Sequence, residues 1–374
     1  MIRKNIVHIV GARPNFMKLA PVHEALRQYE NFNQIIIHGG QHYDHNMSDI
    51  FFEEFNLPNP DVNLEISGKS VLQQIGLGIM KLEEVLPSFH PDLVIIYGDI
   101  NATAYASIVC SKLGYKLAHI EAGLRSFDLS MPEETNRMIA DCLSNYFFTP
   151  SIDADQNLLK SGIDKENIFF VGNVMIDTLV KFLPKTDGIK YSFQIPDEYG
   201  LVTLHRPSNV DDEKELLNIL EVLLELSEEA PIVFPIHPRT KSKVPSRFFN
   251  YPSNLILIEP LGYLPFLNLQ KNAKYIITDS GGVQEEATYL GVPCFTFRKN
   301  TERPITVEVG TNKIVGTNTN DLKETIINFL NGDVKKAHIP EYWDGKTAIR
   351  IAAHINYILN SKLEPVLEIN TNNF

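Results

Sequence analysis

The stretch SVLQQIGLGIMKLEEVLPSFHPDLVIIYG, residues 70–98, places a helical pattern directly before a short apolar run. Residues 70–86 carry the helical pattern, and LVIIYG at 93–98 is apolar nearly throughout. Apolar runs of this kind are typical of parallel strands that are buried on both faces of a sheet. The stretch therefore predicts one helix-to-strand step of an α/β fold.

The same alternation of strand and helix continues along the chain, and it predicts a doubly wound α/β fold. Further helical patterns cover 213–229 and 345–360. The short β-rich runs are 5–10, 33–39, 93–98, 116–121, 146–151 and 168–172 in the first half, then 201–205, 232–237, 255–260, 275–280, 294–298 and 313–316.

A lapse in this pattern at 183–200 predicts a linker between two Rossmann-like domains, and a length of 374 residues also favours two domains. We expect an N-terminal domain over 1–182 and a C-terminal domain over 201–345. A C-terminal helix over 346–361 is expected to pack back towards the N-terminal domain, and a loose tail is expected over 362–374.

Composition limits the classes of partner. The chain is 44% hydrophobic and 21% charged, with a formal charge of −12, which argues against broad binding to nucleic acid or to an anionic membrane. Cys110, Cys142 and Cys294 show no metal-ligand spacing and are expected to be reduced thiols. No apolar stretch has membrane-spanning length. We expect a cytoplasmic protein without membrane insertion.

Ligands of open parallel sheets bind outside the carboxyl ends of the strands, so the loops after the predicted strands are the informative positions. These loops concentrate Arg, His, Asp and Glu. They read GARPNFMK, GGQHYD, GDINAT, EAGLRS, HRPSN, HPRT and DSGGVQEEA. Two domains with such edges are expected to face each other across a cleft.

Phosphate binding is indicated most clearly by TDSGGVQEEA, where Ser280, Gly281 and Gly282 follow a strand and open a helix. Glycines permit close backbone approach, and a helix N-terminus favours anions. An ordinary turn with a serine cap is the alternative. Glu286, in the second turn, is a candidate acceptor for ribose hydroxyls.

Three cations are candidates for holding a pyrophosphate. Arg13 and Lys18 lie in the first strand-to-helix turn, which lacks the glycine fingerprint of a nicotinamide site, and Arg303 lies beside Pro304. Surface positions are the alternative for each.

Acid–base chemistry is suggested by Asp99, Glu121, Glu133 and His205, which follow apolar runs or a helix start. Each alone could be a cap or a structural group, but together on converging strand ends they favour a reactive site. Glu134 is interpreted as a helix-start charge. His42 and His237 form no metal set with their neighbours, so we predict no catalytic metal.

An ordered series of motifs resembles the non-hydrolysing UDP-N-acetylglucosamine 2-epimerases, which have the two-domain GT-B fold. The series covers almost the whole chain: GARPNFMKLAPV, GGQH, GDINATA, HIEAGLRS, MPEETNR, VGNVMIDTL, TLHRPSN, LGYLPFLNL, TDSGGVQEEA, TERP and DGKTAIRI. The resemblance implies interconversion of UDP-GlcNAc and UDP-ManNAc, for the supply of surface polysaccharide precursors. It implies no cofactor, a UDP-sugar as the small-molecule partner, and a homodimer.

The implied chemistry removes the C2 proton as UDP leaves C1, and it gives 2-acetamidoglucal and bound UDP. UDP then adds back while a proton reaches the other face of C2, which requires acid–base groups around one carbon and a cationic grip on the diphosphate.

The resemblance assigns roles residue by residue. Asp99 and Glu133 would be the acid–base pair, Glu121 would orient the sugar or shuttle a proton, and His205 would act near the diphosphate. Substrate and UDP contacts would come from Arg13, Lys18, His42, Arg137, His237, Phe266, Ser280, Gly281, Gly282, Glu286 and Arg303.

Departures from the family pattern leave alternatives open. Ser208 replaces a usual acidic residue, and Asp44 and Lys69 depart from the second, allosteric UDP-GlcNAc site of many bacterial members. Parts of the sequence also resemble epimerases of UDP-2,3-diacetamido-2,3-dideoxyglucuronic acid, for which Lys69 or Arg239 would supply a cation. The other hypotheses for its function are a GT-B glycosyltransferase, a hydrolysing epimerase and a non-catalytic UDP-sugar-binding protein.

Overall fold

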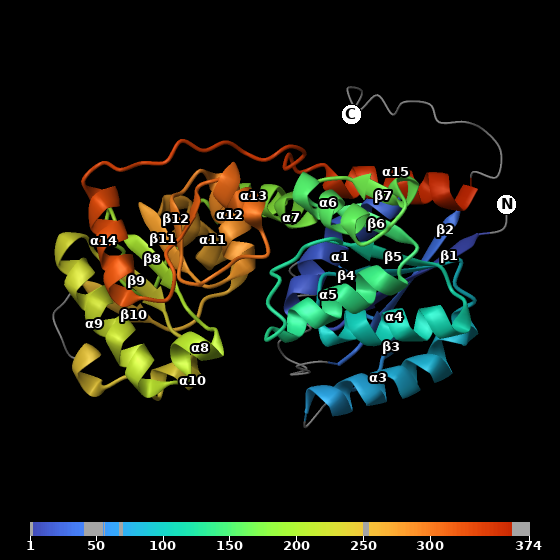
Figure 1. Ribbon diagram of the computed structural model, residues 1–374, viewed down its shortest axis with the longest axis horizontal. Coiled ribbons are helices and arrows are strands. Elements are labelled where there is room, and N and C mark those ends of the chain that lie inside the picture. The colour runs from blue at the N-terminus through green and yellow to red at the C-terminus, as the bar shows by residue number, and fades with distance from the viewer. Residues whose placement is uncertain (1–2, 41–54, 56, 67–69, 250–253, 361–374) are drawn as a thin grey trace.

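The computed structural model describes residues 3–40, 55, 57–66, 70–249 and 254–360. Within them the chain forms two parallel β-sheets, each flanked by helices, which lie side by side along the long axis of the molecule (Figure 1). The doubly wound α/β class predicted from the sequence is confirmed.

The first sheet has seven strands in the order β3-β2-β1-β4-β5-β6-β7. Its strands are β1 (Lys4–Val10), β2 (Phe32–His38), β3 (Val62–Asn63), β4 (Leu93–Tyr97), β5 (Leu117–Ile120), β6 (Tyr146–Thr149) and β7 (Ile168–Phe170). The helices of this half are α1 (Arg13–Leu26), α3 (Val71–Val85), α4 (Asn101–Leu113), α5 (Pro132–Leu143), α6 (Ile152–Lys160) and α7 (Val174–Phe182). The sequence pattern missed only the two-residue edge strand β3 in this sheet.

The second sheet has six strands in the order β10-β9-β8-β11-β12-β13. Its strands are β8 (Gly200–Thr203), β9 (Ile232–Pro235), β10 (Leu255–Ile258), β11 (Tyr275–Thr278), β12 (Cys294–Thr296) and β13 (Asn312–Ile314). The helices are α8 (Pro207–Val210), α9 (Glu213–Glu229), α10 (Pro238–Lys241), α11 (Tyr263–Asn272), α12 (Gly281–Leu290), α13 (Pro304–Glu308) and α14 (Thr319–Leu330).

Both sheets are covered on their two faces, which explains why their strands are apolar nearly throughout. Every described strand pair is parallel. In β4, Val94 and Ile96 join the core on one face of the sheet, whereas Leu93 and Ile95 join the core on the other. A strand with two buried faces cannot alternate apolar with polar residues, so its sequence reads as a continuous apolar run.

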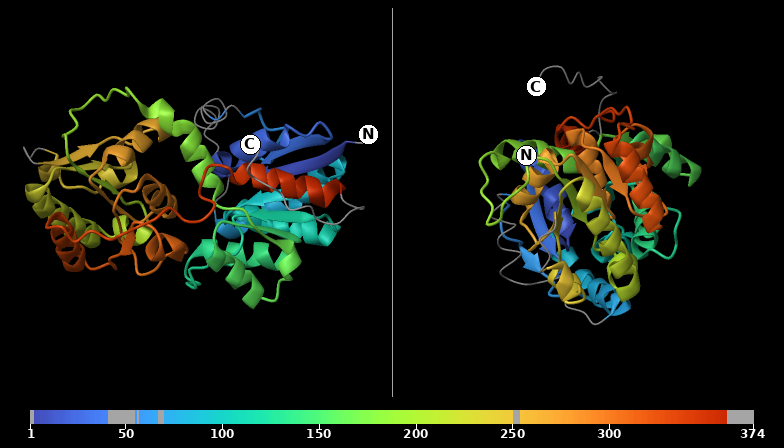
Figure 2. Two further views of the ribbon diagram at one scale, coloured as in Figure 1. Left: turned by 90° about the horizontal axis from the view of Figure 1, so that it is seen from above. Right: turned by 90° about the vertical axis from the view of Figure 1, so that its left-hand side faces the viewer.

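The last helix, α15 (Thr347–Asn360), lies against α1 and α7 of the first sheet, after the chain has crossed from the second (Figures 1 and 2). The carboxylate of Asp177 accepts hydrogen bonds from the backbone N–H groups of Thr347 at 3.0 Å and Ala348 at 2.6 Å. These are among the first N–H groups of α15, which have no partner inside the helix, and the carboxylate satisfies them. The Trp343 indole donates to the carbonyl of Pro150 at 3.0 Å.

The order of strands reverses between β1 and β4 in the first sheet, and between β8 and β11 in the second. Crevices form at such switch points, outside the carboxyl ends of the strands. Asp99, His205 and Ser280 lie directly after β4, β8 and β11, and Lys18 lies in the second turn of α1, the helix that follows β1. The topology therefore places the predicted site residues where each sheet would bind a ligand.

Candidate active site

A cavity of about 560 Å³ lies between the two sheets and is lined by residues of both halves. Among the residues predicted from the sequence, those on its wall are Lys18, Asp99, Glu133, Arg137, His205, His237, Phe266, Ser280, Gly281, Gly282, Glu286 and Arg303. Glu121 lies behind the wall. His42 and the side chain of Arg13 lie outside the described residues. One cavity thus brings together most of the candidates.

Asp99 follows β4, and its carboxylate is held by the guanidinium of Arg137. The Arg137 Nε and Nη2 atoms donate to Oδ2 of Asp99 at 3.0 and 2.7 Å, which leaves Oδ1 as the oxygen that can face a ligand. Burial alone would raise the pKa of Asp99. The positive charges of Arg137, Lys18 and Arg303 outweigh it, and the pKa lies below the usual range. Asp99 is therefore a carboxylate near neutral pH.

Glu121 begins the loop after β5 and bridges two cations from different halves of the molecule. Its Oε1 lies 2.8 Å from Nη2 of Arg303, and its Oε2 pairs with the ammonium of Lys18. Glu121 has a φ of 71°, in the left-handed region, where a residue with a side chain carries strain of order 1–3 kcal/mol. Its N–H donates to the carbonyl of Phe148 at 3.0 Å and fixes this backbone.

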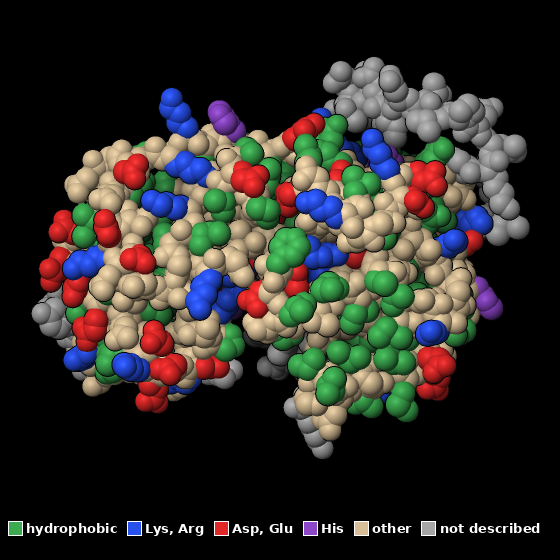
Figure 3. Space-filling view, in the orientation of Figure 1, with side chains coloured by type: hydrophobic (Ala, Val, Ile, Leu, Met, Phe, Trp, Pro, Cys, Tyr) green, Lys and Arg blue, Asp and Glu red, His purple; other side chains and the backbone are tan. Residues whose placement is uncertain are grey.

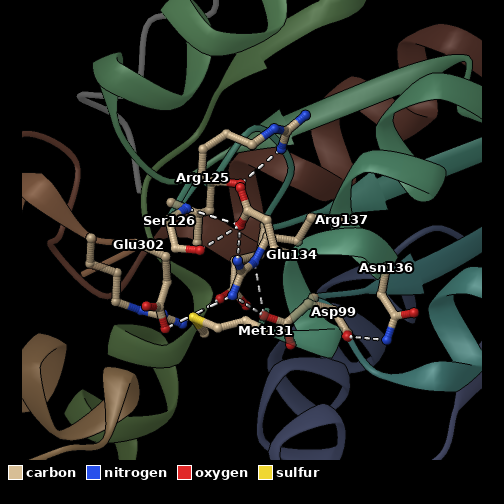
Figure 4. A network of polar contacts seen from close by, with 12 residues as sticks. Asp99, Arg125, Ser126, Met131, Glu134, Asn136, Arg137 and Glu302 are labelled. Carbon is tan, nitrogen blue, oxygen red and sulfur yellow. Dashed lines mark hydrogen bonds and ion pairs between the residues drawn. The ribbon is translucent and has the colours of Figure 1, made fainter. Parts of the chain in front are cut away.

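Glu133 and Glu134 both lie in the first turn of α5, but they occupy different environments. Glu133 is exposed and lines the cavity. Glu134 is buried and accepts hydrogen bonds from the N–H and hydroxyl of Ser126 at 2.9 and 3.0 Å, from the N–H of Phe127 at 2.9 Å, and from Arg137 at 2.5 Å (Figure 4). The interpretation of Glu134 as a mere helix-start charge was wrong, because the loop before α5 folds back onto it.

In the second half, Ser280, Gly281 and Gly282 form the N-terminus of α12. The Ser280 hydroxyl makes no capping bond, so the first N–H groups of α12 are left for another partner. A Cβ on Gly281 would lie 2.4 Å from Nη1 of Arg303, so only glycine permits this approach. A Cβ on Gly282 would meet nothing within 4 Å, because this position faces open space. The turn has the form of an anion site.

His205 lies at the end of β8 and is joined to β11 by Asp279. The buried Asp279 carboxylate accepts hydrogen bonds from the N–H groups of His205 and Arg206 at 3.1 and 2.9 Å, and from Nδ2 of Asn209 at 2.9 Å. The His205 ring is largely exposed, with Nδ1 3.1 Å from Asp279. Burial alone would raise the pKa of Asp279, but the hydrogen bond and charge of His205 lead the contacts that lower it. Asp279 therefore orients the ring.

Arg303 is the centre of the buried ionic network. It lies 2.7 Å from Glu285, 2.6 Å from Glu302 and 2.8 Å from Glu121, so that one guanidinium faces three carboxylates. Glu302 also pairs with Arg298 at 2.9 Å and lies 3.9 Å from the guanidinium groups of both Arg137 and Arg206 (Figure 4). This network joins the two halves of the molecule, and Arg137, Glu285, Glu302 and Arg303 of the network line the cavity.

Glu286 is buried and accepts hydrogen bonds from the Tyr263 hydroxyl at 3.1 Å and from Nε2 of Gln270 at 2.6 Å. Its predicted position beside a ribose is compatible with its place on the cavity wall, where Phe266 and His237 also lie. Among the described residues, no group of three or more His, Cys, Asp or Glu side chains could hold a metal ion.

Sequence reasoning missed six charged residues of this site: Glu134, Arg206, Asp279, Glu285, Arg298 and Glu302. Asp279 ends a predicted strand directly before the SGG turn, and Glu302 precedes Arg303 in the TERP motif. Their positions gave a signal, but their burial depends on contacts between segments far apart in the chain, which no local pattern indicates.

Glu285 predicts a pH dependence of stability. Burial raises the pKa of its carboxyl from 4.5 to about 7, with Arg303 opposing the shift and Glu121 adding to it. The folded state therefore retains a proton that the unfolded state loses. The resulting stabilisation, on the order of 3 kcal/mol at 1.36 kcal/mol per pKa unit, is present below pH 4.5 and lost as the pH rises to 7.

The variant Glu285→Gln is expected to abolish this contribution. Urea unfolding at pH values between 4.5 and 8 measures the free energy of unfolding of both proteins. The value for Glu285→Gln should increase relative to that of the wild type as the pH rises. Glu84→Gln, at an exposed position on α3, is the control. Equal pH profiles for the Glu285 variant and the wild type would contradict the assignment.

Two parallel Rossmann-like sheets, joined across a cavity at their switch points, define the GT-B class of fold. Within that class, residues 24–356 match the family model described as UDP-N-acetylglucosamine 2-epimerase. The chain belongs to this family of isomerases, as the motifs predicted.

Curated relatives match nearly end to end. A UDP-N-acetylglucosamine 2-epimerase of Methanocaldococcus jannaschii is 45% identical over 361 residues, which cover 93% of this chain and 98% of the relative. A UDP-2,3-diacetamido-2,3-dideoxy-D-glucuronate 2-epimerase of Pseudomonas aeruginosa is 38% identical over 354 residues, which cover 94% and 99%. The crystal structure of the M. jannaschii UDP-GlcNAc 2-epimerase in complex with UDP-GlcNAc and UDP matches with a TM-score of 0.84 at 43% identity, covering 94% of this chain and 99% of that one.

None of the helices that the structure describes combines the length and the apolar character needed to cross a membrane.

Proposed function

We propose that this chain interconverts UDP-GlcNAc and UDP-ManNAc by eliminating UDP to 2-acetamidoglucal and adding it back on the other face, in the supply of surface polysaccharide precursors. One observation carries the proposal. A single cavity of about 560 Å³ is lined by Asp99 and Glu133 of the first half and by the N-terminus of α12 of the second.

The second half would hold the UDP moiety. The N-terminus of α12 offers backbone N–H groups to a phosphate, and the open space at Gly282 leaves room for it. Lys18 and Arg303 would stabilise the negative charge that develops on the diphosphate as the C1–O bond breaks. Glu286 would accept a ribose hydroxyl, and Phe266 would line the nucleotide pocket.

The first half would transfer protons at C2. Epimerisation removes a proton from one face and returns one to the other, so it requires two groups around the carbon. Asp99, which lines the cavity and whose Oδ1 is not held by Arg137, is proposed as one, and Glu133, exposed in the first turn of α5, as the other. In elimination, the C2–H electron pair forms the C1=C2 bond while the C1–O pair leaves with UDP, so no redox partner is needed.

Glu121 is proposed as a positioning residue. Both of its carboxylate oxygens are paired, with Lys18 and with Arg303, so it would hold the two cations next to each other, where both could contact a diphosphate. His205, oriented by Asp279, would lie near the leaving oxygen of the diphosphate.

The product assay tests the proposed function. Purified protein with UDP-GlcNAc should produce UDP-ManNAc until the two sugar nucleotides reach equilibrium, followed by NMR of the anomeric protons. Free ManNAc with stoichiometric UDP would instead place the chain among hydrolysing epimerases, and binding without turnover would identify a UDP-sugar-binding protein.

A second candidate substrate is UDP-2,3-diacetamido-2,3-dideoxyglucuronic acid, which carries a carboxylate at C6. The P. aeruginosa relative of that name favours this alternative, and Arg206 on the cavity wall would supply the extra cation. Lys69 and the side chain of Arg239, predicted for that role, lie outside the described residues. Turnover of this uronate but not of UDP-GlcNAc would identify the uronate as the substrate.

Self-association as a homodimer is supported by an apolar face on α3, α4 and α5, which lie next to one another in the first half (Figure 3). The exposed apolar side chains of these three helices include Leu72, 81% exposed, Met80, 67% exposed, and Leu77, Leu113 and Met138. Exposed apolar patches of this kind are typical of interfaces between proteins.

The double variant Leu72→Lys with Met80→Lys is therefore expected to convert a dimer to a monomer. Sedimentation velocity would measure the mass of each species in solution. Val334→Lys, at a 62% exposed position of the second half, is the matched control and should leave the dimer intact. A monomeric wild type, or a double variant that remains dimeric, would contradict this interface.

A further inference from the structure

A buried histidine lies behind the proposed acid–base site, on β5. The His119 side chain is fully buried, and both of its ring nitrogens contact oxygen atoms. Nδ1 lies 2.7 Å from Oδ1 of Asp141, and Nε2 lies 2.8 Å from the backbone carbonyl oxygen of Gly98. Gly98 directly precedes Asp99.

Neither of these oxygens can donate a proton. A carbonyl oxygen only accepts, and Asp141 is ionised. The guanidinium of Arg125, 2.6 Å from Asp141, favours the ionised form of this carboxyl independently of the histidine. A neutral imidazole has only one N–H to donate, so it would leave one of these two contacts without a hydrogen. Two acceptor oxygens, one at each ring nitrogen, match the two N–H groups of an imidazolium.

The contact between Nε2 of His119 and the Gly98 carbonyl supports the backbone segment that carries Asp99. The carbonyls of three successive residues each receive a buried side-chain donor. The Tyr97 carbonyl accepts hydrogen bonds from Nδ2 of Asn15 and from the hydroxyl of Thr103, both at 3.0 Å. The Asp99 carbonyl accepts one from Nδ2 of Asn136 at 2.9 Å. The carbonyl of Gly98 is the acceptor for Nε2 of His119. Gly98 also has a φ of 62°, a conformation that favours glycine, so this segment needs such support.

The other side of the ring joins this segment to the next loop of the site. Oδ2 of Asp141 accepts hydrogen bonds from the N–H of Gly123 at 3.2 Å and from Nη1 of Arg125 at 2.6 Å. Gly123 and Arg125 belong to the loop that begins with Glu121. The His119–Asp141 pair therefore connects the backbones that carry Asp99 and Glu121.

We propose that His119 is a positioning residue for the epimerisation, held as an imidazolium between Asp141 and the Gly98 carbonyl so that Asp99 is fixed at the substrate. The proposal rests on the function proposed above, in which Asp99 exchanges a proton with C2. A displacement of a reacting group by about 1 Å costs about 10²-fold in rate, which sets the expected size of the effect.

Matched variants test the positioning. His119→Gln can donate to the Gly98 carbonyl, but its amide oxygen then faces the Asp141 carboxylate, so the segment should move and kcat for C2 exchange should fall about 10²-fold. The double variant His119→Gln with Asp141→Asn restores the chain of hydrogen bonds, because the amide of the new asparagine can donate to the amide oxygen of the glutamine. Its kcat should be at least about tenfold higher than that of His119→Gln alone. UDP affinity should not change in either variant.

A spectroscopic measurement tests the protonation state without any turnover. Proton–nitrogen correlation spectra of the wild-type histidine rings at pH 7 should show one ring with both nitrogens protonated, and Asp141→Asn should convert it to a ring with one protonated nitrogen. Asp141 contacts the ring directly, and Arg125 pairs with Asp141. A wild-type His119 ring with one protonated nitrogen would overturn the proposal.

The kinetic outcomes also decide. A kcat of His119→Gln equal to that of the wild type, or a double variant no faster than the single one, would overturn the positioning role. A loss of cooperative unfolding in the single variant leaves the decision to the ring spectra and to Asp141→Asn. Failure of wild-type C2 exchange would instead reject the proposed function, and the protonation state of the ring would still be measured.

Discussion

Asp99→Asn is expected to abolish exchange of the C2 proton while UDP still binds. Asparagine keeps the shape of the side chain, and its amide oxygen can still accept from Arg137, but it cannot take up a proton. Loss of a general acid or base typically lowers a rate by 10²–10⁴-fold. NMR of C2 exchange would measure the rate, and titration calorimetry would measure UDP affinity.

The control for this variant is Asp128→Asn, at a carboxylate of the loop before α5 that accepts hydrogen bonds from the N–H and hydroxyl of Ser130. It should exchange C2 at close to the wild-type rate. Exchange retained in Asp99→Asn would remove Asp99 from the mechanism and leave Glu133 as the principal candidate. Lost UDP binding would show that the substitution disturbs the whole site.

Arg303→Met is expected to lower the free energy of unfolding by about 3–5 kcal/mol, the cost of breaking a buried ion pair by removing one partner. The methionine fills much of the volume but leaves Glu121, Glu285 and Glu302 without their shared cation. Urea unfolding at pH 8 would measure the loss, because Glu285, whose pKa in the wild type is about 7, is then ionised and paired with Arg303 in the wild type.

A surface pair provides the matched control. Arg247 pairs with Glu221 at positions where both side chains are exposed, and Arg247→Met should cost less than about 1 kcal/mol. Adding Glu285→Gln to Arg303→Met removes one of the three stranded charges and should restore part of the stability. An Arg303 variant no less stable than the Arg247 variant would contradict the account of the network.

The fold was accessible from the sequence because its dominant signal is local. Strands buried on both faces must be apolar throughout, so runs such as 93–98 mark them without knowledge of their neighbours. The strand β3 was missed because two residues at a sheet edge leave no run to detect. The loops that follow the strands then indicated the site, since parallel topology brings their ends to one edge.

The ionic network was less accessible, because it depends on which charges face each other. Glu134 and Glu133 are neighbours in sequence, yet one is buried under the loop 124–131 and the other lines the cavity. Glu302 meets arginines that lie 96 and 165 positions away along the chain, at Arg206 and Arg137. Pairings of this range are set by tertiary packing, and the sequence contained no local sign of them.

Incorporation of solvent deuterium tests the central claim most directly. The protein is incubated with UDP-GlcNAc in D2O, and the C2 position of both sugar nucleotides is followed by NMR. Removal of the C2 proton predicts deuterium at C2 in the UDP-ManNAc that forms and, as the reaction reverses, in the remaining UDP-GlcNAc. UDP-ManNAc that retains the original C2 proton, or no conversion of UDP-GlcNAc, would contradict the account.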